Sequence, residues 1–179
     1  MNIREADIED VAGIALLHVE SWRTAYRGAY SDAYLDGDVY PDRQRVWRER
    51  LTAPAERQFT IVAEQDGAIM GFACGRGDED PRWGTLLDNL HVRPDEKWRG
   101  IGTRLIGEVA LRTQRDWPAS GLYLWVLESN APARRFYERL GAQNEERTTS
   151  EPPGGGEVIT LRYAWPVVAS LVAATTAKR

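Results

Sequence analysis

Two glycines between a strand-like run and a helix-like run are the residues of this sequence whose spacing best suits chemistry. Gly100 and Gly102 follow the strand-like run 88–92 and open an apolar periodic segment. A strand, a glycine-rich turn and a helix N-terminus together form an anion site, because backbone N–H groups point outward and the helix dipole adds roughly half a positive charge. Glycine also lets the backbone approach a phosphate closely. The spacing therefore predicts a phosphate-bearing ligand held between Lys97 and Thr103.

Two other glycine-rich phosphate motifs fit this stretch poorly. A Rossmann fingerprint needs a third glycine and an acidic residue about 20 positions later on a strand, and both are missing. A P-loop needs Lys and then Ser or Thr directly after its last glycine, which is also missing. We expect at least one of Lys97 and Arg99 to contact a phosphate; the alternative is that both are solvated surface charges.

The composition limits the class of protein. The chain has 179 residues, of which 42% are hydrophobic and 28% charged, as in a globular protein with one domain. A net charge of −4 argues against a general nucleic-acid binder. The single cysteine, Cys74, excludes an internal disulfide, and two histidines, His18 and His91, argue against a structural metal site. No signal-peptide pattern opens the chain, and the apolar run 165–177 is too short to cross a membrane and contains Pro166. A cytoplasmic enzyme or small-molecule binder without a metal is expected.

The elements that must position these residues follow from periodicity and turn residues. Strands are predicted at 2–5, 59–64, 68–74, 83–92, 122–127, 142–147 and 158–164. Helices are predicted at about 8–26, at 31–35, from Pro41 to Pro54, at 101–115 and from Asn130 to Gly141, with an acidic loop at 77–81. Asp66-Gly67 predicts a tight primed hairpin turn. This order predicts an α+β fold with a mixed, mostly antiparallel sheet of about seven strands and flanking helices, because a doubly wound fold would alternate from the start. A single domain at 1–165 and a tail at 166–179 are expected.

Two blocks of the sequence resemble the GNAT superfamily of acyl-CoA-dependent N-acyltransferases. The first block is Leu-His-Val-Arg-Pro at 90–94, followed by Lys-Trp-Arg-Gly-Ile-Gly-Thr-Arg-Leu at 97–105. The second block lies within 126–142. The element order matches over residues 2–163, and the segment 18–28 is similar to a bacterial branch whose substrates are largely unassigned. The sequence departs from the family's pattern at Lys97, where Arg or Gln is usual, and at Trp98, where Gly is frequent; Ala142, after Gly141, is smaller than usual.

The resemblance implies where the donor, acetyl-CoA, would bind. The strand carrying Leu90 to Val92 would splay from its parallel neighbour at 122–127 and bind pantetheine through its backbone, while the loop would bind the pyrophosphate. The donor-binding residues expected on this basis are Leu90, His91, Val92, Lys97, Trp98, Arg99, Gly100, Ile101, Gly102, Thr103, Asn130, Ala133 and Tyr137. Asn130 has a second role open to it, as a helix N-cap.

Tyr137 is the catalytic residue that the resemblance implies. Its hydroxyl would donate a proton to the departing CoA thiolate; the alternative is core packing beside Ala133, a role that Phe136 suits better. A thiol has a reference pKa near 8.5, so the thiolate is already a tolerable leaving group. Hydrogen bonding to the developing charge would therefore matter most, and removing the hydroxyl is expected to lower the rate roughly 10²-fold.

The acceptor amine needs to lose a proton, since a free alkyl amine has a pKa of about 10. The candidate bases are Glu20, Glu64, Asp88 and His91, and His91 has the most suitable intrinsic pKa. Strict alternation places Asp88, Leu90 and Val92 on one face of the strand and Asn89 and His91 on the other. A structural or surface role is the alternative for each candidate. A backbone N–H near Val92 would polarise the thioester carbonyl.

Acceptor recognition is expected from the first helices, through His18, Trp22, Tyr26 and Tyr30, and from Asp88; ordinary core packing is the alternative for the aromatic residues.

The sequence therefore predicts an N-acetyltransferase that transfers the acetyl group of acetyl-CoA to a primary amine by direct attack in a ternary complex. The acceptor is a small amine, an amino-acid-like metabolite, an antibiotic or a protein amine. The alternative is a non-catalytic acyl-CoA sensor, which would not need Tyr137. No nucleic-acid or membrane partner is expected, and a homodimer is a reasonable expectation for this superfamily.

Overall fold

A computed structural model describes residues 1–177. The elements in chain order are β1 (Asn2–Glu5), a 3₁₀ turn η1 (Ile8–Asp10), α1 (Val11–Ala25), α2 (Asp32–Asp36), α3 (Val39–Thr52), β2 (Gln58–Gln65), β3 (Ala68–Asp80), β4 (Gly84–Val92), η2 (Pro94–Glu96), α4 (Ile101–Asp116), β5 (Leu122–Leu127), α5 (Ala131–Arg139), β6 (Gln143–Ser150), β7 (Val158–Trp165) and α6 (Val168–Thr176). The strands form one seven-stranded sheet in the order β1-β2-β3-β4-β5-β7-β6. All neighbouring strands in it are antiparallel except β4 and β5. The predicted α+β fold is therefore confirmed.

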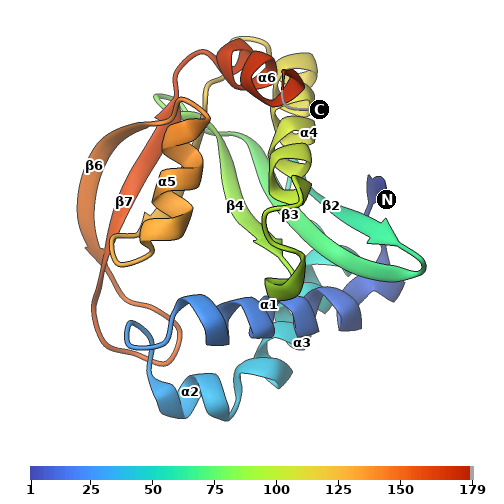
Figure 1. The fold of residues 1–179 in the computed structure, drawn as a ribbon, viewed down its shortest axis with the longest axis vertical. Coiled ribbons are helices and arrows are strands. Elements are labelled where there is room, and N and C mark those ends of the chain that lie inside the picture. Colours follow the sequence, from blue (N-terminus) through green and yellow to red (C-terminus); the bar gives the residue numbers. More distant parts are fainter. Residues whose placement is uncertain (178–179) are drawn as a thin grey trace.

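Helices cover both faces of the sheet. α4, α5 and α6 lie on one side, and α1, α2 and α3 lie on the other (Figure 1). The apolar side chains at helical spacing on α4 are all buried in a first core: Ile101, Leu105, Ile106, Val109 and Ala110. A second core lies between α1, α3 and the sheet, where Ile14 and Trp47 pack near Phe72. The sheet is thus held from both sides close to its parallel pair.

Local turn chemistry fixes several boundaries as predicted. Asp66 and Gly67 both have positive φ, +53° and +76°, which is the backbone of a primed hairpin turn between β2 and β3. The Asn130 side chain caps α5 by accepting the Ala133 N–H at 3.2 Å. Gly141, with φ of +86°, lies directly after the C-cap residue Leu140 and turns the chain toward β6.

One predicted loop is wrong. Residues 77–80 continue β3 rather than forming an acidic loop, and Asp80 pairs with Gly84 of β4. The Asp80 carboxylate accepts the backbone N–H groups of Arg82 and Trp83 at 2.8 and 3.0 Å, so the turn is shorter than its composition indicates. β6 likewise extends to Ser150.

The C-terminal tail folds onto the domain as far as the structure describes it. α6 lies beside α4 (Figure 1), and Leu171 is fully buried in the first core. Residues 178 and 179 of the predicted tail lie outside the described residues. Within residues 1–177, no helix is both long and apolar enough to cross a membrane.

The parallel pair is splayed, as predicted. β4 and β5 pair only at Thr85 with Leu122 and at Leu86 with Tyr123. Beyond these residues β4 continues along β3 as far as Val92, while β5 continues along β7. The two strands therefore diverge, and each keeps one edge without a strand partner in the described part of the chain.

A β-bulge changes which way the middle of β4 faces. Cys74 of β3 is opposite Asn89, but Gly75 is opposite Leu87, so Asp88 is an extra residue. The bulge places both Leu87 and Leu90 on the α4 side. Asp88 instead points toward α3, where its carboxylate lies 2.6 Å from Arg50 Nη1. The prediction that Asp88 shares a face with Leu90 and Val92 is therefore wrong, because strict alternation ignores the bulge.

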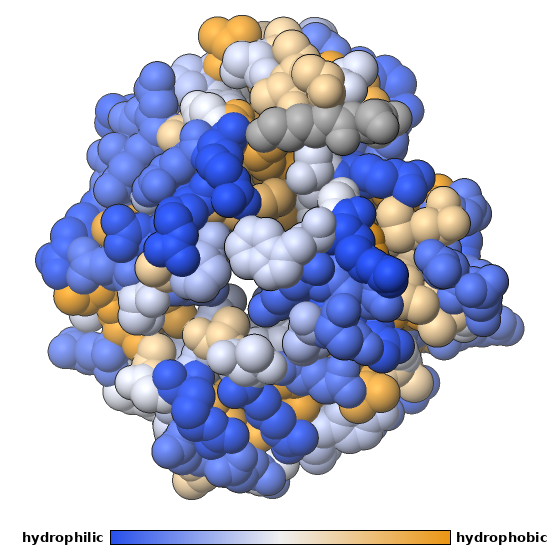
Figure 2. Space-filling model, viewed as in Figure 1, coloured by the Kyte–Doolittle hydropathy of each residue, from blue (hydrophilic) through white to orange (hydrophobic). Residues whose placement is uncertain are grey.

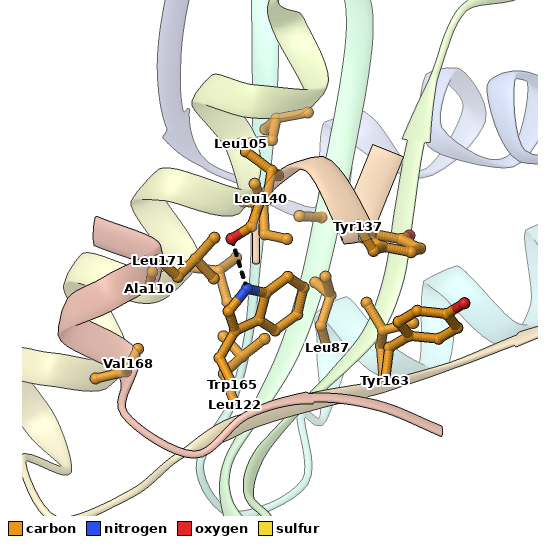
Figure 3. Packing of buried hydrophobic residues seen from close by; sticks show 14 of the residues in the cluster. Leu87, Leu105, Ala110, Leu122, Tyr137, Leu140, Tyr163, Trp165, Val168 and Leu171 are labelled. Carbon is orange, nitrogen blue, oxygen red and sulfur yellow. Dashed lines mark hydrogen bonds between the residues drawn. The ribbon is translucent and has the colours of Figure 1, made fainter. Parts of the chain in front are cut away.

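A buried tryptophan holds α5 in place. Trp165, at the end of β7, is 1% exposed and donates its indole N–H to the carbonyl of Leu140 at 2.9 Å. Figure 3 shows this hydrogen bond with Tyr137 and Tyr163 on one side of the indole and Val168 and Leu171 on the other. The C-terminal end of α5, and with it Tyr137, is thereby fixed to the sheet.

Candidate active site

A cleft of about 500 Å³ opens where β4 and β5 diverge. Residues of α4 and α5 line it from one side of the sheet, and residues of α1 line it from the other. Figure 2 shows this face of the molecule hollowed near its centre. A ligand on the α4–α5 side can therefore meet a second ligand on the α1 side through the gap in the sheet.

The cleft brings together nearly all the predicted site residues. Its lining includes Trp22, Tyr26, Asp88, Leu90, His91, Val92, Lys97, Trp98, Gly100, Ile101, Gly102, Thr103, Asn130, Ala133 and Tyr137. Arg99 is the exception: it is not part of the lining, and its guanidinium pairs with Glu96 at 2.7 Å. Of the remaining acceptor candidates, Tyr30 lines the cleft, whereas His18 is buried beneath it.

The start of α4 has the features of an anion site. Gly100 is the N-cap residue, in the left-handed conformation with φ of +81°, and no side chain in the described residues caps the helix. The first N–H groups of this 16-residue helix are thus left for a ligand. A Cβ added to Gly102 would meet only ordinary contacts, 3.5 Å to Phe136 and 3.7 Å to Val92. The protein's own packing does not require glycine there, which fits a cradle that a phosphate approaches closely.

The tyrosine expected to act as acid is buried at the other end of this wall. Tyr137 is 8% exposed, and its ring meets Phe136 and Trp165 edge-on with centroids 5.2 and 6.2 Å apart. Burial raises the pKa of Tyr137 above its usual value of 10, so the hydroxyl is protonated at neutral pH. Among the described residues, no group hydrogen-bonds this hydroxyl. Tyr137 is one of the residues that line the cleft.

Aromatic side chains from α1 and the segment after it form the opposite wall. Trp22 and Tyr30 meet edge-on at 5.2 Å, and Tyr26 and Tyr30 lie 4.8 Å apart between ring centroids. The Arg43 guanidinium lies 4.7 Å from the centre of the Trp22 ring, away from the cleft lining. Burial raises the pKa of Tyr26, and the nearby hydroxyls of Tyr30 and Tyr137 add to this effect.

Only two of the four candidate bases reach the cleft. Glu20 and Glu64 line a separate depression beside the β2–β3 hairpin, where Glu64 accepts a hydrogen bond from Arg4 at 2.8 Å. Asp88 lines the cleft, but its carboxylate lies 2.6 Å from Arg50 and 3.8 Å from Arg76. The remaining candidate is His91.

His91 is a buried, neutral histidine. Its Nδ1 is 2.8 Å from the Ser21 hydroxyl, and its ring centroid is 4.5 Å from that of His18. Burial lowers the pKa of His91 to about 3, and the charge of Lys97 adds a smaller effect. Burial also lowers the pKa of His18, whose Nδ1 accepts the indole N–H of Trp47 at 2.9 Å. Neither imidazole can hold a proton at neutral pH.

Sequence reasoning missed two residues that matter to the cleft. Ser21 lies on α1 one turn after His18 and beside Trp22, so helical spacing could have found it. Arg139, in the last turn of α5, lines the cleft and lies 5.8 Å from the Trp98 ring centroid. No motif in the sequence indicated Arg139.

Among the described residues, no group of three or more His, Cys, Asp and Glu side chains is placed to hold a metal ion.

Comparisons with known proteins agree with this geometry. The family model described as acetyltransferase (GNAT) family matches residues 19–142. The uncharacterized N-acetyltransferase YuaI of Bacillus subtilis is 26% identical over 175 residues, which is 96% of each chain. An uncharacterized N-acetyltransferase of Archaeoglobus fulgidus is 32% identical over 146 residues, 76% of this chain and 89% of its own. The crystal structure of PaiA N-acetyltransferase from Thermoplasma acidophilum, in complex with coenzyme A, has the same fold, with a TM-score of 0.72 and 19% identity over 92% of this chain and 98% of its own. With the family model covering most of the chain, this protein belongs to the GNAT family and is an N-acetyltransferase.

Proposed function

We propose that this N-acetyltransferase takes its acetyl group from acetyl-CoA and transfers it directly to a primary amine while both substrates are bound. One observation carries the proposal: the Tyr137 hydroxyl, the uncapped start of α4 and the unpaired edge of β4 share one cleft. Two structures of similar fold support this donor: that of PaiA N-acetyltransferase is a complex with coenzyme A, and that of YncA from Salmonella typhimurium contains acetyl-CoA.

The donor would bind mainly through backbone. The N–H groups at the start of α4, together with the Lys97 ammonium, would hold the pyrophosphate. The pantetheine arm would lie along the edge of β4 at Leu90 and Val92, as an added strand does. This arrangement supports a thioester placed near Tyr137, at the inner end of the same wall.

The transfer itself would need little from side chains. The amine nitrogen attacks the thioester carbonyl carbon, the C–S bond breaks, and the departing sulfur takes a hydrogen bond and then the proton from Tyr137. The Tyr137 phenolate recovers its proton from water, and the proton released by the amine goes to water. A backbone N–H near Val92 would stabilise the oxyanion. Holding the two reactants side by side would supply much of the remaining rate.

The acceptor end of the cleft supports a small amine with an apolar body. Trp22, Tyr26 and Tyr30 present ring faces and edges there, and aromatic surface binds both apolar groups and ammonium groups. Asp88 is a carboxylate at the same end, already paired with Arg50. We therefore favour a compact primary amine over a protein amine, because the amine must reach through the gap between β4 and β5.

Thiol release from acetyl-CoA over a panel of amines tests the proposal. Tyr137→Phe removes one hydroxyl and should lower kcat roughly 10²-fold while leaving the Kd for CoA nearly unchanged. Tyr40→Phe is the matched control, because the Tyr40 hydroxyl accepts a hydrogen bond from Gln44 and lies outside the cleft. Wild-type kcat in Tyr137→Phe would remove this residue from the mechanism, and no thiol release with any amine would count against the donor.

A further inference from the structure

Trp98 is the residue of the cleft that the mechanism leaves unexplained. Its side chain is 80% exposed, and its backbone is left-handed, with φ of +71°. A bulky residue rarely adopts this conformation, which glycine adopts at little cost. Among the described residues, no hydrophobic cluster includes Trp98, so packing within the protein does not compensate for the strain or the exposure. Strained residues of this kind concentrate at ligand sites.

The position of Trp98 indicates which part of a ligand it can reach. It lies in the loop before α4, two residues ahead of Gly100, and it lines the cleft. Across the cleft edge, the Arg139 guanidinium at the end of α5 lies 5.8 Å from the Trp98 ring centroid. A cation within about 6 Å of a ring centroid is in cation–π range, so Arg139 contacts the indole and can orient it. The pair spans the outer end of the cleft, on the side of the α4 anion site.

The order of groups along acetyl-CoA selects the occupant, and this step rests on the proposed function. The thioester is at one end of the molecule, followed by pantetheine, the pyrophosphate and the adenosine 3′-phosphate. With the thioester at Tyr137 and the pyrophosphate at Gly100 to Thr103, the adenosine must leave the cleft past the loop that carries Trp98. The group that arrives there is a flat, electron-poor heteroaromatic ring, which stacks well on indole.

We propose that Trp98 is a binding platform for the adenine ring of the donor, and that Arg139 is a positioning residue that orients the indole. The strained, exposed indole then has a function: it stacks on the nucleotide and discriminates the complete coenzyme from a shorter acyl-pantetheine. A glycine in its place would relax the loop but would not recognise the base.

Donors with and without the nucleotide test this role. Acetyl-CoA and acetyl-pantetheine carry the same thioester, and only acetyl-CoA carries adenosine. Trp98→Gly should reduce the ratio of kcat/KM for acetyl-CoA to that for acetyl-pantetheine about tenfold, the usual effect of losing one stacked base. Trp98→Phe keeps an aromatic face and should recover most of the ratio. Arg139→Ala should lower the ratio less than Trp98→Gly does.

Two further readouts separate a binding role from a loop defect. Trp98→Gly should have a melting temperature at or above that of the wild type, because glycine suits a φ of +71°. Arg57→Gly, at a left-handed residue outside the cleft, is the control for this backbone effect. CoA should also quench tryptophan fluorescence in the wild type more than pantetheine does, and Trp98→Phe should abolish the difference.

The outcomes are distinct. An equal loss of kcat/KM with both donors would overturn the proposal, because Trp98 would then act through the loop, and an unchanged ratio in Trp98→Gly would overturn it as well. Failure of the proposed function looks different: the wild type would release no thiol from either donor.

Discussion

The acceptor amine, rather than a histidine, should set the pH dependence of acetyl transfer. His91 is the only histidine that lines the cleft in the described part of the chain, and burial lowers its pKa to about 3. A group with that pKa cannot hold a proton taken from an amine with a pKa near 10. Asp88, the other candidate in the cleft, is already paired with Arg50 at 2.6 Å. The enzyme should therefore use the fraction of acceptor that is already unprotonated.

The size of the effect follows from the acceptor's own titration. For an alkyl amine with a pKa near 10.4, only about four molecules in 10⁴ are unprotonated at pH 7, and this fraction rises about tenfold per pH unit. The kcat/KM for the acceptor should thus rise about a hundredfold from pH 6.5 to pH 8.5. Tyr137 does not oppose this rise, because burial raises its pKa above 10 and it stays protonated throughout.

Initial rates of thiol release at saturating acetyl-CoA and low acceptor measure this profile. Two acceptors give the sharpest test: an α-amino compound, with a pKa near 8, should reach its plateau about two pH units below an alkyl amine. His91→Asn should keep the slope of both profiles. A shared inflection near pH 6.5 that disappears in His91→Asn would refute the reasoning, because His91 would then be the base.

Three further predictions concern the cradle, the core and acid stability. Gly102→Ala should raise the free energy of unfolding in urea by up to about 1 kcal/mol. The same variant should weaken CoA binding in calorimetry about tenfold, the equivalent of one hydrogen bond to a charged group. A loss of both stability and CoA affinity would show that Gly102 has a structural role. Trp165→Phe leaves the buried Leu140 carbonyl without its hydrogen-bond donor and should lower the free energy of unfolding by about 1–3 kcal/mol. The variant should also lower kcat by a larger factor than it changes KM. An unchanged kcat would mean that Trp165 does not position α5. The unfolded state binds a proton at His91 near pH 6.5, whereas the native state binds one only near pH 3. The contribution of His91 to the free energy of unfolding should therefore be complete above pH 6.5 and fall by about 2 kcal/mol by pH 5, with His18 acting in the same direction. His91→Asn should reduce this dependence on pH, and an equal dependence in the variant would contradict the buried neutral state.

Periodicity and turn residues were sufficient to predict most of the fold. The buried face of α4, from Ile101 to Ala110, follows from helical spacing alone, because nothing on that face competes with burial. The hairpin at Asp66-Gly67 is equally local, since its backbone conformation depends on those two residues. Spacing alone predicted the glycine turn from Lys97 to Thr103, whereas most of the other cleft-lining residues, Asn130 and Tyr137 among them, were expected from the resemblance to the family.

The failures share one physical cause, which is that they depend on pairing between segments. The bulge at Asp88 is a property of the register between β3 and β4, and a one-residue change of register moves a side chain to the other face. Arg139 reaches the cleft only because α5 lies opposite the loop before α4. Local patterns carry no information on such placements.

Residues that do not line the cleft help to determine its geometry. One wall is carried by β4, which is bonded to β3, and the other by β5, which is bonded to β7. The two walls meet only at the start of the parallel pair, beside Gly84. Gly84 has a φ of +85°, and a Cβ added to it would lie 2.4 Å from the carbonyl oxygen of Gly121. Because only glycine allows this approach, Gly84 lets β4 begin close to the start of β5, next to the two paired positions. The distance between the donor edge of β4 and Tyr137 thus depends on a residue that touches neither substrate, and on Trp165, which fixes α5 from below.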